Sequence, residues 1–123
     1  MGKWRNGTGL LTVPGRAEPV AVEIAASYGT RRRGLLGRDG IDGALLLTPC
    51  NSVHSFGMRF AIDVAYLDRR LNVVAVRTMP PGRLGLPRPR ARHVLEARAG
   101  AMEGWGLRAG VPLGITAGRG PEG

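Results

Sequence analysis

Several ingredients of common functional sites are scarce in this chain of 123 residues. It has one cysteine, which excludes an intramolecular disulfide and cannot form a zinc site by itself. No apolar run approaches the length of a membrane span, and the N-terminus lacks the apolar core of a signal peptide. We therefore expect a soluble cytoplasmic protein that binds no membrane.

Positive charge dominates the rest of the composition. Lysine and arginine total 18 against 9 acidic residues, a net charge of +9, and only one of the basic residues is lysine. Such charge attracts nucleic acid, but proteins that bind single strands also need aromatic side chains beside a basic groove, and aromatics are only 5% here. We interpret the charge as a solvated arginine-rich surface; nucleic-acid contact is disfavoured but stays open.

Alternating apolar residues predict strands. Residues 10–13 and 20–26 lie either side of a Pro-Gly turn, which indicates a first hairpin. From Phe56 to Tyr66 every even position is apolar and the odd positions are small or polar, a period of two that indicates one half-buried strand. A turn at residues 68–72 then leads to a return strand, which makes a second hairpin.

The remaining segments complete a mainly β pattern. The further expected elements are a short helix within 27–38, a buried strand at 44–47, an exposed loop at 79–92, and strands at 93–98 and 111–116. They predict a single mainly β domain over residues 9–116, a compact β-sandwich or squat barrel of about seven strands with one short helix in its N-terminal half. Residues 1–8 and 117–123, which are Gly-rich and polar, are expected to be disordered tails.

Four segments of this chain resemble a known family. They are RRRGLLGR (31–38), GALLLTPCNSVHSFGMRFAIDVAYLD (43–68), PPGR (80–83) and HVLEARAG (93–100). They are similar to small bacterial and archaeal proteins of domain of unknown function 192, also called uncharacterised protein family 0127. The similarity is strongest to a subgroup with the motif Cys-x-x-Val-His-Ser/Thr-Phe-Gly-Met-Arg-Phe-x-Ile-Asp-Val. The resemblance implies a mainly β domain with a short helix near its N-terminus, and no known activity, cofactor or catalytic residue.

One departure from the family pattern concerns the turn after the central strand. The family usually has Asp-Gly there, whereas this chain has Arg70-Leu71. A tight turn needs a residue with positive φ, a role that glycine and asparagine accept most readily. We therefore expect Asn72 to take that role, with a hairpin that is longer or bulged.

Cys50 and His54 form the first candidate site. If Pro49 opens one helical turn, their Cβ atoms come within roughly 5–6 Å, close enough for a thiolate–imidazole pair. If the segment is extended, they lie about 13 Å apart at ~3.3 Å per residue and form no pair. A free cysteine is most often a small buried hydrophobe, and a metal would need further ligands, for which His93 is one candidate. We assign no metal and no cofactor.

Two acidic residues on predicted strands form the second candidate site. Asp63, with Arg59 four residues before it, and Glu96 both interrupt apolar runs where acids are uncommon. If their strands are neighbours, the carboxyl groups can face each other and share a proton, as general acid/base pairs do. The alternative, which we favour, is a structural role in which each accepts backbone hydrogen bonds or pairs with an arginine.

Arginines form the third candidate. The run at residues 31–33 and the loop residues at 83–92 can converge into an anion site, because the arginine fork matches phosphate and carboxylate. The alternative is that these charges lie separately in solvent. The anion-binding candidates are Arg33, Arg83, Arg88 and Arg90.

These observations favour a binding module for a small ligand or a protein partner, with residues 80–92 as a rim or flap. The candidate ligand-binding residues are Cys50, His54, Asp63, Arg59 and Glu96. One alternative is a metal- or thiol-dependent enzyme that uses Cys50, His54 and Asp63. The other is a basic accessory protein with non-specific nucleic-acid contact. No catalytic signature is recognisable, so no residue is assigned a catalytic role.

Overall fold

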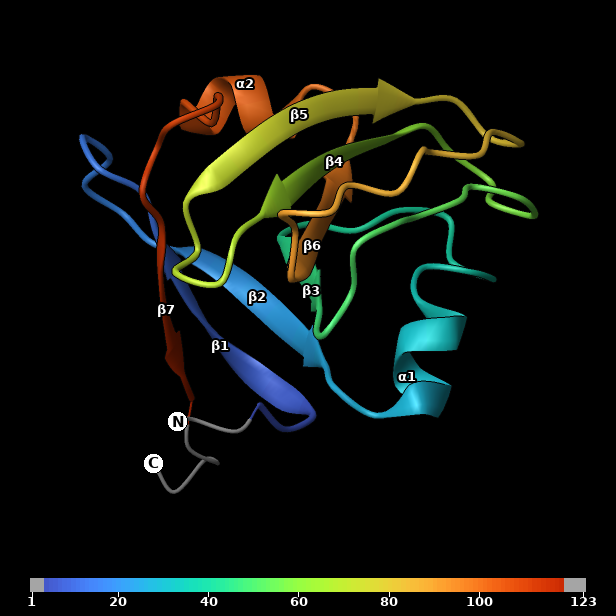
Figure 1. Cartoon of the computed structure of the whole chain (residues 1–123), viewed down its shortest axis with the longest axis horizontal. Coiled ribbons are helices and arrows are strands. Elements are labelled where there is room, and N and C mark those ends of the chain that lie inside the picture. Colours follow the sequence, from blue (N-terminus) through green and yellow to red (C-terminus); the bar gives the residue numbers. More distant parts are fainter. Residues whose placement is uncertain (1–3, 119–123) are drawn as a thin grey trace.

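The computed structural model describes residues 4–118, which form one curved sheet of seven strands and two short helices (Figure 1). The strand order is β5-β4-β6-β3-β2-β1-β7. The elements are β1 (Gly7–Thr12), β2 (Val20–Ala25), α1 (Tyr28–Arg33), β3 (Ala44–Leu47), β4 (Ile62–Leu67), β5 (Val73–Met79), β6 (His93–Arg98), α2 (Ala101–Trp105) and β7 (Gly114–Ala117). The prediction of a mainly β domain with about seven strands is confirmed, and the sheet is open, with β5 and β7 as its end strands.

Most of the sheet is antiparallel. The exception is the pair β2 and β3, which run parallel because α1 and the segment after it carry the chain back across the sheet. β1 pairs with β2 on one side and with the last strand, β7, on the other. The two predicted hairpins, β1–β2 and β4–β5, are both present.

The strand predicted over residues 56–66 is shorter and more deeply buried than expected. β4 begins only at Ile62, because the chain turns just before it: the N–H of Met58 donates to the carbonyl of Ser55 at 3.2 Å, and Gly57 has a φ of 78°. All six residues of β4 are buried, so both of its faces are covered. The prediction of one long, half-buried strand was therefore wrong, since the alternation continues through a turn.

Smaller differences arise at glycines and turns. α1 ends at Arg33 because Gly34 has a φ of 49°, and α2 was not expected in a segment rich in glycine. In the turn after β4 the residue with positive φ is Leu71 at 70°, so the assignment to Asn72 was wrong. The carboxylate of Asp68 holds this turn by accepting hydrogen bonds from two backbone N–H groups.

The ends of the chain also differ in part. β1 starts at Gly7, inside the segment expected to be a disordered tail, and β7 extends to Ala117. The rest of the predicted tails, residues 1–3 and 119–123, lies outside the described residues.

The core has one apolar cluster on each face of the central strands. On β4, Ala65 and Leu67 belong to the first cluster, whereas Ile62, Val64 and Tyr66 belong to the second. The first is enclosed by the curl of β1 and β2 and by α2. The second lies beneath connecting segments: its members from outside the strands are Leu35, Ile41, Val53, Met58 and Ala91.

Two of these connecting segments form a ladder that we call the flap, residues 51–56 and 83–88. Three backbone hydrogen bonds join them, with N···O distances of 2.7, 2.8 and 2.9 Å. Within the flap, Val53 and Ser55 are buried, while His54 and Leu84 face each other as an isolated β-bridge. The guanidinium of Arg88 lies over the buried ring of Tyr66, 4.9 Å from its centroid, which anchors one end of the flap.

Asp63 on β4 connects the sheet to α2. One carboxylate oxygen accepts the hydroxyl of Thr78 at 2.7 Å, and the other accepts the backbone N–H groups of Gly100 and Met102 at 2.9 and 3.1 Å. A carboxylate at the start of a helix satisfies N–H groups that have no partner within the helix. Asp63 is buried and fully engaged, so its role is structural.

Replacing Asp63 with Asn is expected to lower the free energy of unfolding by about 2–3 kcal/mol, the range for a lost hydrogen bond to a charged group. The amide oxygen can still accept the two backbone N–H groups, but the negative charge that faces the start of α2 is lost, and the Thr78 hydroxyl must accept from the amide where it donated to the carboxylate. Thr78→Val removes only one of the bonds and should cost about 1 kcal/mol. Urea unfolding followed by circular dichroism measures both, and equal stability of Asp63→Asn and the wild type would contradict this role.

Candidate functional site

A cavity of about 130 Å³ opens on the second face of the sheet, between α1 and the flap. Its floor comes from neighbouring strands, with Leu47 from β3 and Glu96 from β6. One wall is α1 and the residues that follow it, and the opposite wall is the segment after β3. The lining residues are Arg31, Arg32, Arg33, Gly34, Leu35, Leu36, Leu47, Cys50, Ser52, Val53, His54, Met58 and Glu96.

Glu96 is the chemically unusual residue of this cavity. Only 4% of it is exposed, and in the described part of the chain its carboxyl group has neither an ion pair nor a hydrogen bond. Burial disfavours the charged form and raises the pKa of Glu96 from 4.5 to about 7. The carboxyl group therefore changes protonation near neutral pH.

Gly34 keeps the approach to this carboxyl group open. A Cβ atom at position 34 would lie 3.8 Å from Oε1 of Glu96 and 3.7 Å from the carbonyl oxygen of Arg31. The backbone at Gly34 has a φ of 49°, a region that residues with a side chain rarely adopt. The glycine that ends α1 thus also leaves space beside the only buried acid of the cavity lining.

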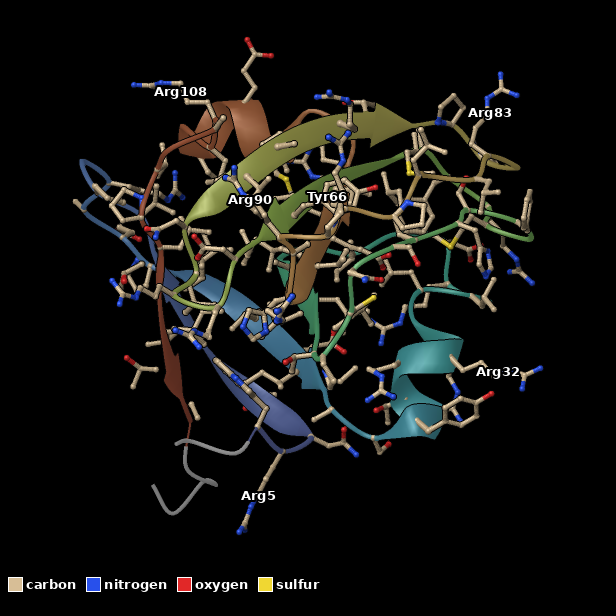
Figure 2. All side chains as sticks on the ribbon, viewed as in Figure 1. Arg5, Arg32, Tyr66, Arg83, Arg90 and Arg108 are labelled. Carbon is tan, nitrogen blue, oxygen red and sulfur yellow. The ribbon has the colours of Figure 1, made fainter. Side chains whose placement is uncertain are left out.

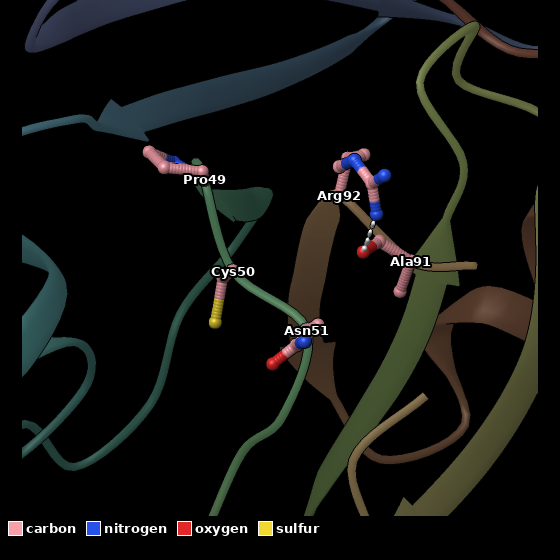
Figure 3. A pocket seen from close by; sticks show the side chains of 5 residues that line it. All are labelled: Pro49, Cys50, Asn51, Ala91 and Arg92. Carbon is pink, nitrogen blue, oxygen red and sulfur yellow. Dashed lines mark hydrogen bonds between the residues drawn. The ribbon is translucent and has the colours of Figure 1, made fainter. Parts of the chain in front are cut away.

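Cys50 lines the same cavity and is half-buried. Its thiol donates to the carbonyl of Ser52 at 3.0 Å, and burial raises the pKa of the thiol above its usual value. On its other side Cys50 borders a second, shallow hollow with Pro49, Asn51, Ala91 and Arg92. Figure 3 shows the sulfur directed away from Arg92, whose guanidinium bonds to the carbonyl of Ala91. The geometry favours the protonated thiol and not a reactive thiolate.

His54 does not form a pair with Cys50. The segment between them is part of the extended flap and not of a helical turn, so the extended alternative is the one observed. Nδ1 of His54 accepts the N–H of Phe56 at 3.2 Å, and the two rings stack with centroids 5.1 Å apart. His54 is exposed at the mouth of the cavity, and Cys50 lies deeper.

Asp63 lies outside this site. β4 and β6 are neighbours, as the paired-acid hypothesis required, but Asp63 stands opposite Ala97 while Glu96 stands opposite Val64. Adjacent residues of a strand point to opposite faces, so the two carboxyl groups are on different faces of the sheet. The hypothesis that they face each other was wrong, and an enzyme site that joins Asp63 to Cys50 and His54 is not assembled.

The arginine candidates separate into two groups. Arg33 lines the cavity with its neighbours in α1, whereas Arg83, Arg88 and Arg90 are absent from the cavity lining. Figure 2 places Arg32, Arg83 and Arg90 at well-separated points of the molecule. The convergence of both groups on one anion site was therefore wrong, and the α1 arginines alone border the cavity.

The remaining candidates have local partners. Arg59 pairs with Asp39 at 3.0 Å on the surface, with 60% of its side chain exposed. His93 is buried, and its Nδ1 shares a hydrogen bond of 2.8 Å with the hydroxyl of Thr48. Residues 4–118 contain no cluster of three His, Cys, Asp or Glu side chains that could hold a metal ion.

Sequence reasoning missed part of the cavity lining, including Gly34 and Ser52. Neither Gly34 nor Ser52 was identified as a candidate site residue, although both line the cavity. A glycine at the end of a helix is a common stop signal, so its sequence position carried no hint of a cavity.

Within residues 4–118 no helix has the length and hydrophobicity that a membrane span requires.

Comparison with solved structures finds the same fold in two bacterial proteins. A protein of Sinorhizobium meliloti, described provisionally as a transcription regulator, has a TM-score of 0.77 at 18% identity over 93% of this chain and 98% of its own. A protein of unknown function from Novosphingobium aromaticivorans has a TM-score of 0.72 at 17% identity over 85% of this chain and 83% of its own. At such identities the similarity establishes the fold alone.

Sequence relatives extend the comparison to archaea. A UPF0127 protein of Pyrococcus horikoshii is 34% identical over 67% of this chain and 76% of its own length. A UPF0127 protein of Pyrococcus furiosus is 28% identical over 85% of this chain and 94% of its own. The family model DUF192, described as an uncharacterized ACR, matches residues 10–115. On the strength of this match and of these relatives, the chain belongs to the DUF192 family, whose members carry the name UPF0127.

Proposed function

We propose that this domain binds a small polar ligand in the cavity between α1 and the flap. The observation that carries the proposal is Glu96, a buried carboxyl group without a hydrogen-bond partner in the described chain that faces an open cavity. Because the carboxyl oxygens of Glu96 have no partner in the described chain and are not among its fully enclosed atoms, their hydrogen-bonding capacity is available to a molecule in the cavity. A ligand that donates a hydrogen bond to Glu96 supplies that partner.

The arginines beside the cavity and its volume indicate the charge and the size of the ligand. Arg32 and Arg33 are exposed at its border, and neither has a carboxylate within ion-pair distance in the described chain. Guanidinium groups favour carboxylate or phosphate. The volume of about 130 Å³ suits a molecule much smaller than a nucleotide. The ligand we infer is a small molecule with a hydrogen-bond donor, such as an amine, at one end and an anionic group at the other.

The most direct test is a thermal-shift screen of small molecules in four groups: amino acids and amino phosphates, simple carboxylates and phosphates, simple amines, and neutral polyols. We expect stabilisation by the first group, with binding lost in Glu96→Gln. A ligand that binds only the folded state adds RT ln(1 + [L]/Kd), about 2.7 kcal/mol at a hundredfold excess over Kd. Equal stabilisation of wild type and Glu96→Gln by every hit would contradict the proposal.

Glycine substitutions provide a matched pair for the same screen. Gly34→Ala places a methyl group beside Glu96, whereas Gly37→Ala adds one at a site with nothing within 4 Å. Both glycines have positive φ, at 49° and 81°, so both variants carry backbone strain. We expect ligand stabilisation to be lost in Gly34→Ala and kept in Gly37→Ala. If ligand stabilisation is lost in both variants, backbone strain, and not blocked access to Glu96, explains the loss.

The protonation of Glu96 should appear in the stability of the protein without ligand. The pKa of Glu96 is about 7 in the folded state and 4.5 in the unfolded state. Below pH 4.5 the carboxyl group is protonated in both states, so its burial does not lower the free energy of unfolding there. As the pH rises from 4.5 to about 7, the unfolded state loses its proton first, and the free energy of unfolding falls, by roughly 3 kcal/mol in total above pH 7. Glu96→Gln should therefore be more stable than wild type above pH 7 and similar below pH 4.5, as measured by urea unfolding across pH.

The control for this measurement is Glu18→Gln, which changes an exposed acid in the turn between β1 and β2. It removes one negative charge, as Glu96→Gln does, but from an exposed position, so we do not expect the stability gain of Glu96→Gln. A stability difference between wild type and Glu96→Gln that does not vary with pH would contradict the burial of an unpartnered carboxyl group.

The single cysteine reports on the same cavity. Because burial raises its pKa, Cys50 should react with iodoacetamide at pH 7 more slowly than a free thiol such as N-acetylcysteine. A ligand that occupies the cavity should slow the reaction further, since Cys50 lines it. Mass spectrometry of the alkylated protein measures both rates. Alkylation faster than that of the free thiol would identify a reactive cysteine and favour thiol chemistry instead.

A further inference from the structure

The flap has a second distinctive property, a group of exposed apolar side chains beside the cavity. Six large apolar side chains are exposed in the described chain, and three of them are on the flap: Phe56, Leu84 and Leu86, with 50%, 67% and 74% exposed. A fourth, Leu36, borders the flap and is 37% exposed. Single apolar residues on a surface are ordinary, but a cluster is unusual for a monomer and marks an interaction site.

Their outward orientation follows from the ladder that holds the flap. A side chain at position 85 would collide with the hydroxyl of Tyr66, at 2.7 Å, so this side of the strand faces inward. Alternate residues of an extended segment point to opposite sides. Leu84 and Leu86 therefore both point away from the core, and the backbone hydrogen bonds of the ladder keep them there.

Contacts on the outer side join four of these exposed residues, and Leu86 lies two positions after Leu84 on the same side of its segment. We call this surface the apolar patch: Leu36, His54, Phe56, Leu84 and Leu86. His54 pairs with Leu84 across the ladder and stacks on the ring of Phe56. A Cβ atom at the next residue, Gly57, would lie 3.3 Å from Cδ2 of Leu36, so the patch continues from the flap to the segment after α1.

Positive charge surrounds the apolar patch. Arg83 precedes Leu84 and is exposed, and Arg32 and Arg33 share the cavity wall with Leu36. Figure 2 shows Arg83 and Arg32 on the same side of the molecule, above and below the patch segments. Asp39, an exposed acid of the neighbouring segment, is already paired with Arg59. An acidic partner therefore has charge complementarity here, and a second copy of this chain, with its own charge of +9, does not.

We propose that the apolar patch docks an acidic segment of a partner protein that carries leucine or phenylalanine side chains. The apolar side chains supply the contact area, and the surrounding arginines select acidic residues and speed the encounter. Nucleic acid fits less well, because bases need flat aromatic rings for stacking and the patch offers mainly leucine.

The test begins with a random peptide library displayed on phage and selected on the folded protein. We expect selected peptides to be rich in Asp and Glu combined with Leu or Phe. Their affinity, measured by fluorescence anisotropy, should fall at least about tenfold in Leu84→Ser/Leu86→Ser and also in Arg83→Gln. Matched controls are Leu10→Ser, an exposed leucine on β1, and Arg5→Gln, which Figure 2 shows on a different side of the molecule from Arg83. These should bind like wild type.

All variants change exposed residues, and thermal unfolding checks that they fold as wild type does. A library that yields no binding peptide, peptides without acidic residues, or equal affinity for Leu84→Ser/Leu86→Ser and Leu10→Ser would each overturn the proposal. A single-stranded oligonucleotide that displaces the peptides and loses affinity only with Arg83→Gln would replace it with a nucleic-acid site. Leu84, Leu86 and Arg83 do not line the cavity, so small-ligand binding should survive in these variants, and the two proposals fail separately.

Discussion

Burial of β3, β4 and β6 on both faces is the constraint on which the rest of this structure depends. A strand that is covered on both faces has no side that faces solvent, because its alternate residues belong to one apolar cluster or the other. A polar side chain on such a strand is therefore buried. The two faces are covered differently. The curl of the sheet and α2 close one face, whereas the other is closed by connecting segments that form a ladder of their own. The loops are therefore part of the core, and their sequence is restricted accordingly.

Two acids on these strands show two ways of meeting that constraint. Asp63 faces the side closed by regular structure and receives three hydrogen bonds, including two from the start of α2. Glu96 faces the side closed by loops and receives none from the described chain, so burial shifts its equilibrium toward the neutral form. Of these two acids on neighbouring strands, Asp63 stabilises the fold through its hydrogen bonds. Glu96 makes no hydrogen bond in the described chain and can accept one from a ligand. The difference follows from register, since one residue of offset decides which face each acid enters.

Much of the fold was predictable from local patterns, because alternation and turn residues act over a few positions. The hairpins β1–β2 and β4–β5, the short strand β3 and the loop after β5 all follow from them. The first half of the predicted central strand did not, since a turn interrupts it: Phe56 is exposed on the flap, whereas Met58 is buried. The helix α2 depends on capping by Asp63, a residue distant in sequence, so its glycine-rich segment gave no local signal.

Several members of the site were predictable from the sequence, but its geometry was not. Cys50, His54 and Glu96 were identified as candidates, and all three line one cavity. Which acid joins them depends on strand register, which no local pattern encodes, and so Asp63 was grouped with them wrongly. Gly34 shows the same limit, because its importance comes from Glu96 on a strand that follows much later in the chain.

The pairing of β1 with β7 has a consequence for how this chain is made. The two strands join residues near opposite ends of the described chain, with Gly9 opposite Ala117. During synthesis β1 leaves the ribosome before β7 and pairs with β2, but its other edge stays open until β7 has emerged. An open edge presents unpaired N–H and C=O groups that can pair with other chains. The nascent domain therefore exposes the open edge of the six-residue β1 until β7 has emerged, after which the edge strand on that side is the shorter, four-residue β7.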